Sequence, residues 1–88
     1  NQEDNYARKA KAYLPKIKIK GIKNPVIKVI NEATNELEYS IRINCNTYTP
    51  KVFDALASYT IEVGEPDTNV WKTINNVTKD SKKIKVKF

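Results

Sequence analysis

Hydrophobic and polar residues alternate along most of the chain with a period of two. In "KIKIK", residues 16–20, every second residue is isoleucine, which places isoleucines on one face of a strand and lysines on the other. A strand with one apolar and one polar face is half buried. The same pattern predicts further strands at Val26 to about Asn31, 37–45, 58–64, 70–78 and 82–88, with a short edge strand around Lys51 to Phe53.

The alternation also predicts which side chains face the core. Cys45 continues an inward series that begins at Tyr39, so we interpret its thiol as a small buried hydrophobe. Two polar stretches separate strands: "EATNEL" predicts a hairpin turn with Asn35 in a left-handed conformation, and "EPDTN" predicts a second turn. The inward positions are Ile17, Ile19, Tyr39, Ile41, Ile43, Cys45, Tyr59, Ile61, Val63, Ile84, Val86 and Phe88.

The first fifteen residues follow a different pattern. In "DNYARKAKAYL", residues 4–14, apolar side chains recur at helical spacing, Asp4 is a suitable N-cap, and Pro15 ends the segment. A helix this short is marginal alone and must dock on something. We therefore expect residues 1–15 to form a connector helix and residues 16–88 to form a β domain.

The strand pattern predicts an all-β fold. About seven short strands at fairly regular spacing favour an immunoglobulin- or fibronectin type III-like Greek-key sandwich. The first and last strands carry lysine on every second residue, and we expect both at sheet edges.

Composition narrows the chemistry. The 88 residues make one domain at most, and no apolar run is long enough to span a membrane. Histidine is absent and Cys45 is the only cysteine, which argues against a zinc enzyme, a Ser-His triad or a thiol protease. We expect no catalytic residue, no metal site and no cofactor in this chain.

The charge balance is basic. The formal net charge is +6, with fourteen lysines and two arginines. An anionic partner and a role in solubility and edge protection both fit this excess. Nucleic-acid readers depend on arginine and on exposed aromatic platforms. Here the exposed strand faces carry lysine while Tyr39 and Tyr59 alternate inward, so the pattern argues against nucleic acid.

Three aromatic residues are candidates for contact with a ligand or another domain. Trp71 lies opposite Val70 and Ile74 in its strand, and core packing, domain contact and a ligand platform all remain open for it. Tyr48 and Phe53 flank Pro50, where they line a groove or plug the open end of a sandwich.

Glu65 and Asp67 offer oxygens for calcium, but two carboxylates in a turn fall short of a calcium loop.

Several motifs, in order, resemble a known family. "NYARKA" near the start is followed by "NPV", "NEAT", "PKVF" and "YTIEVG". This succession resembles the carboxy-terminal β domain of bacterial alkaline phosphatase D-like metallophosphatases, which are calcineurin-like phosphoesterases and usually exported. The chain departs from the family pattern at Thr49 and at Ala57-Ser58. The metal-binding motifs of that family match nothing in this chain.

The resemblance implies a non-catalytic accessory domain of a secreted, periplasmic or cell-surface enzyme. Its partner would be an upstream catalytic domain, which it would stabilise or orient, or it would tether the enzyme to a surface. From their aromatic character and loop positions, we expect Tyr48, Phe53 and Trp71 to be the contact residues. The alternative is a free-standing module that binds a glycan or another surface polymer, including an anionic one.

Overall fold

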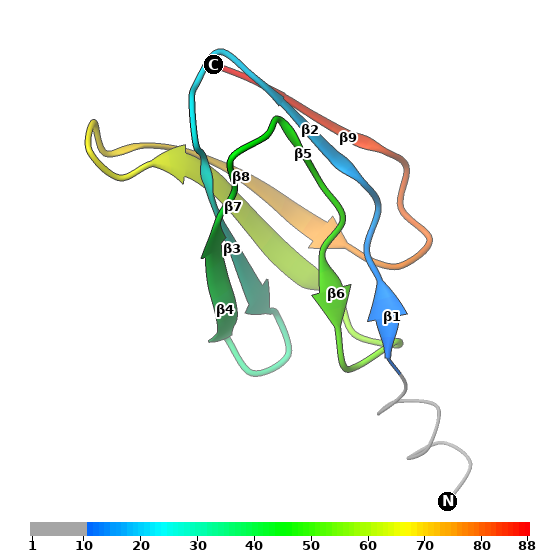
Figure 1. Ribbon diagram of the computed structural model, residues 1–88. Helices are drawn as coiled ribbons and strands as arrows, with labels where there is room; N and C mark the ends of the chain where they lie inside the picture. The colour runs from blue at the N-terminus through cyan, green and yellow to red at the C-terminus, as the bar shows by residue number, and fades with distance from the viewer. Residues whose placement is uncertain (1–10) are drawn as a thin grey trace, which may run out of the picture.

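The computed structural model describes residues 11–88, and these form nine strands arranged in three sheets, with no helix among them (Figure 1). An all-β fold is therefore confirmed. Two of the nine are two-residue strands absent from the seven expected, β1 and β5. The strands are β1 (Ala12–Tyr13), β2 (Ile17–Lys20), β3 (Val26–Asn31), β4 (Glu36–Arg42), β5 (Thr47–Tyr48), β6 (Lys51–Val52), β7 (Tyr59–Glu65), β8 (Val70–Val77) and β9 (Ile84–Lys87).

The four-stranded sheet has the order β4-β3-β7-β8 and is antiparallel throughout. Both of its hairpins turn at asparagine: Asn35 has φ 59° between β3 and β4, and Asn69 has φ 54° between β7 and β8. Asparagine tolerates this left-handed backbone better than other non-glycine residues. The two turns predicted from the sequence are confirmed.

The three-stranded sheet joins the two ends of the described chain. Its order is β5-β2-β9, and β2 runs parallel to β9, with Ile17 opposite Ile84 and Ile19 opposite Val86 (Figure 1). The expectation that both lysine-bearing strands lie at edges is wrong for β2, which lies between β5 and β9. An alternating pattern shows which face of a strand is exposed to solvent, but not how many strands pair with it.

The two-stranded sheet pairs β1 with β6, so that Ala12 lies opposite Val52 and Tyr13 opposite Lys51. The predicted connector helix is therefore wrong at residues 12 and 13, where the backbone pairs with another strand instead of with itself. The amide of the next residue, Leu14, donates to the carbonyl of Pro50 over 2.8 Å, which continues the extended path. The part of the predicted helix before residue 11 lies outside the described residues.

One core lies between the sheets, and each sheet contributes its apolar face. The inward positions predicted for β2 and β7 are confirmed, since all five side chains are fully buried. The arrangement is sandwich-like: the four-stranded sheet forms one layer, and the two smaller sheets supply the opposing apolar residues. The buried cluster consists of Leu14, Ile17, Ile19, Ile27, Val29, Ile43, Val52, Ala57, Tyr59, Ile61, Val63, Val77 and Val86.

The inward series predicted for residues 39–45 holds only in part. Strand β4 ends at Arg42, and the chain bends over residues 44–46. Ile43 is buried, but Cys45 is exposed, because strict alternation stops where the strand ends. Ile41 is 37% exposed, since β4 is an edge strand and its inner face is only partly covered.

Candidate functional site

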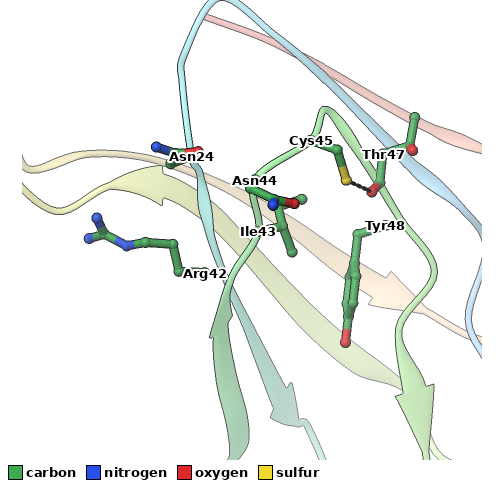
Figure 2. A pocket seen from close by; sticks show the side chains of 7 residues that line it. All are labelled: Asn24, Arg42, Ile43, Asn44, Cys45, Thr47 and Tyr48. Atoms are coloured by element: carbon green, nitrogen blue, oxygen red, sulfur yellow. Dashed lines mark hydrogen bonds between the residues drawn. The ribbon is translucent and has the colours of Figure 1, made fainter.

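A hollow of about 530 Å³ lies where β4 leads into β5 (Figure 2). It is open to solvent, and its wall comes from the loop before β3 and from the segment that joins β4 to β5. Most of its side chains are polar. The lining residues are Asn24, Arg42, Ile43, Asn44, Cys45, Thr47 and Tyr48.

The polar groups of this hollow do not converge on one point. Figure 2 shows the Arg42 side chain directed away from Tyr48, with the backbone of residues 43–45 between them. The Cys45 thiol donates to the carbonyl oxygen of Thr47 over 3.1 Å. A site that orients a small ligand needs several polar groups aimed at the same place. The arrangement therefore supports a surface depression rather than a built pocket.

Tyr48 and Tyr39 link the sheets through their hydroxyls. The Tyr48 hydroxyl donates to the Tyr39 hydroxyl oxygen on β4 over 3.2 Å. The Lys51 amide on β6 also donates to the Tyr39 oxygen, over 3.1 Å. Burial, followed by the hydrogen bond with Tyr48, raises the pKa of Tyr39 above its ordinary value. Tyr39 thus stays neutral and joins one strand from each of the three sheets. Tyr48 has a structural role here.

Phe53 lies on the outward side of the two-stranded sheet and is 66% exposed. Tyr13 is its diagonal neighbour across β1 and β6 and is 58% exposed. The Lys51 ammonium lies 5.7 Å from the centre of the Phe53 ring. Contact with Lys11, together with the Lys11 charge, lowers the pKa of Lys51. These four residues, Lys11, Tyr13, Lys51 and Phe53, form what we call the Tyr13–Phe53 face.

Trp71 lies on the outer face of the four-stranded sheet and not in the core. It pairs with Gly64 across β7 and β8, and its indole ring lies against Gly64, where a β-carbon would collide with ring carbons. The Lys28 ammonium lies over the ring, 4.3 Å from its centre, and Nε1 donates to Asn69 Oδ1 over 3.2 Å. The indole is therefore engaged with its own sheet, which supports the packing interpretation over a ligand platform.

The three predicted contact residues do not form one site. Tyr48, Phe53 and Trp71 belong to the three-stranded, the two-stranded and the four-stranded sheet regions respectively. The helical spacing of residues 4–14 predicts a helix at Tyr13 and gives no sign that it neighbours Phe53. Only the pairing of β1 with β6 places Tyr13 on the same outward side as Phe53.

Glu32 fixes the irregular part of β8. Its Oε2 accepts from the Thr60 hydroxyl over 2.7 Å and from the Asn76 amide over 2.9 Å, and Asn76 has φ 58°. The Asn76 backbone hydrogen bond, then that from Thr60, lowers the Glu32 pKa below 4.5. This carboxylate stabilises a strand irregularity.

Glu65 and Asp67 lie in the turn predicted for them. The Glu65 carbonyl accepts from the Thr68 amide over 3.2 Å, which closes the turn. Across residues 11–88, no three His, Cys, Asp or Glu side chains are grouped as metal ligands would be.

Comparisons of the chain with models of known protein families, with curated proteins and with solved structures found no match. No helix in the described part of the chain is long and apolar enough to cross a bilayer.

Proposed function

We propose that this chain is a non-catalytic β-sandwich module, the carboxy-terminal accessory domain of an exported metallophosphatase. It docks on the upstream catalytic domain of the same protein. The assignment to a metallophosphatase rests on the sequence resemblance alone. We also assign the sandwich to the immunoglobulin- or fibronectin type III-like Greek-key group, which the shared core of the three sheets supports.

The Tyr13–Phe53 face is the observation that carries the docking proposal. Aromatic residues are enriched in interfaces, and this face presents two exposed aromatic side chains at diagonal positions across β1 and β6. The rings lie on β1, the first described strand, and beside β6. An upstream domain would approach the module from this side of the chain.

A matched pair of variants in the full gene product tests this proposal. Phe53→Ser removes an exposed ring from the docking face, while Leu37→Ser removes a side chain that is 54% exposed on β4, outside that face. In the 88-residue chain both changes should leave stability within about 0.5 kcal/mol, because neither site is buried. In the full protein Phe53→Ser should cost roughly 1–2 kcal/mol of interdomain stabilisation, measured by calorimetry.

Three results would contradict the proposal. The first is a coding sequence before residue 1 that specifies no metal-binding phosphoesterase. The second is the same behaviour of the two variants in the full protein. Phosphatase activity in the isolated 88 residues, with any added metal, would also overturn the accessory role.

A further inference from the structure

The parallel pairing of β2 with β9 collects lysines from the two ends of the described chain on one surface. The register puts Lys18 beside Lys85 and Lys20 beside Lys87, and the Ile84 amide donates to the Lys16 carbonyl over 3.0 Å at the same ladder. The isoleucines between them face the core. We call the resulting surface the lysine face; its members are Lys16, Lys18, Lys20, Lys83, Lys85 and Lys87.

The lysine face holds the whole net charge of the protein. The chain has sixteen basic and ten acidic residues, so the ten basic residues outside the face are balanced by the acidic ones. Within residues 11–88 the salt bridge formed is Lys79–Asp80, and no lysine of the face takes part in one. Six like charges on neighbouring strands repel one another, and such an arrangement favours an anionic partner.

The geometry of the face points to a linear partner with repeated charges. Each row is a pair of lysines that lie opposite each other on β2 and β9. Successive rows lie about 6.6 Å apart along the strands, and the two lysines of a row lie about 4.8 Å apart. Between the rows is a hollow of about 220 Å³, lined by Lys18, Lys20, Lys85, Val86 and Lys87. This volume lies below the range of about 300–1,000 Å³ that is usual for pockets of drug-sized ligands.

Two other anionic partners fit less well. The lysine face has no exposed aromatic ring, because the exposed large hydrophobic residues lie on other elements, so nucleic-acid bases have nothing to stack on. It also has no exposed apolar anchor of the kind that holds an interfacial segment in a bilayer. Lysine is a compact point charge that contacts phosphate without a fixed planar geometry.

We propose that the lysine face binds a linear polymer of phosphate groups that carries no bases. This binding is independent of domain docking, since the lysine face and the Tyr13–Phe53 face belong to different sheets. The polymer lies along β2 and β9, so that phosphates at intervals along it contact the successive lysine rows.

Titration with inorganic polyphosphate at several salt concentrations tests the proposal. The variant Lys18→Gln/Lys85→Gln empties one row, and Lys23→Gln/Lys82→Gln is the control, because it removes the same charge from exposed lysines outside the face. The row variant should weaken binding roughly tenfold at low salt and reduce the slope of log K against log salt by about two. The control should keep the wild-type slope.

The outcomes separate the alternatives. Equal losses in the row variant and the control would show diffuse attraction to net charge and overturn the proposal. Binding of oligothymidylate as tight as polyphosphate would assign the face to nucleic acid instead. Binding to vesicles with anionic headgroups but not to polyphosphate would assign it to membranes, and it would equally overturn the proposal.

Discussion

Gly64→Ala is the change that tests the placement of Trp71 most sharply. A β-carbon at position 64 would collide with the indole ring and would also approach the carbonyl oxygen of Val70. Alanine is otherwise favoured over glycine in a strand by roughly 0.5–1 kcal/mol, so any loss of stability comes from these two contacts.

The expected cost follows from overpacking. Forcing a methyl group into an occupied space costs typically about 1–3 kcal/mol. A loss of about 2 kcal/mol corresponds to a fall of roughly 8–16 °C in Tm for a domain of this size. The indole must also move off the sheet and away from Lys28, so its fluorescence emission should shift to longer wavelength.

A double-mutant cycle isolates the ring contact. In a Trp71→Ala background only the Val70 carbonyl opposes the new methyl group, so the cost of Gly64→Ala should fall by about 1 kcal/mol or more. Urea denaturation of the four proteins gives the coupling energy. Equal costs in both backgrounds, within about 0.5 kcal/mol, would refute the placement of the ring against Gly64.

Three further changes test the core, the link between sheets and the carboxylate. Ile61→Ala should cost about 2–5 kcal/mol in urea denaturation because the side chain is fully buried, while Ile41→Ala, at 37% exposure, should cost clearly less; equal costs would contradict the layer assignment. Tyr39→Phe removes the oxygen that accepts from the Lys51 amide and should cost about 1–3 kcal/mol, so an unchanged denaturation midpoint would exclude the link. Glu32→Gln should lower the free energy of unfolding at pH 7, and the difference should shrink as pH falls below 4.5 through the lowered folded-state pKa, since the wild-type carboxylate then protonates; a difference independent of pH would contradict this.

Local patterns predicted the local structure well. The bounds of β3, the left-handed Asn35 and the buried face of β7 all follow from alternation and turn chemistry, which depend on neighbouring residues only. Cys45 shows the limit of this reasoning. Alternation continued for three residues beyond Arg42 predicts an inward thiol, but β4 ends at Arg42 and the chain bends over residues 44–46.

Nonlocal pairing was the part that the sequence did not predict. Residues 12 and 13 fit a helical period, but their backbone pairs with residues 51 and 52, and tertiary contacts override helix propensity. The parallel alignment of β2 with β9 links residues more than sixty positions apart, and nothing in either strand marks the other as its partner. Both candidate surfaces, the Tyr13–Phe53 face and the lysine face, depend on such pairings.

The most direct test is therefore the register between β2 and β9, measured by nuclear Overhauser effects in the labelled protein. Parallel pairing predicts backbone contacts from Ile19 to Val86 and from Ile17 to Ile84, with the lysines of both strands on the same side of the sheet. Antiparallel contacts between these segments, or β9 paired with another strand, would disperse the lysines and contradict the account.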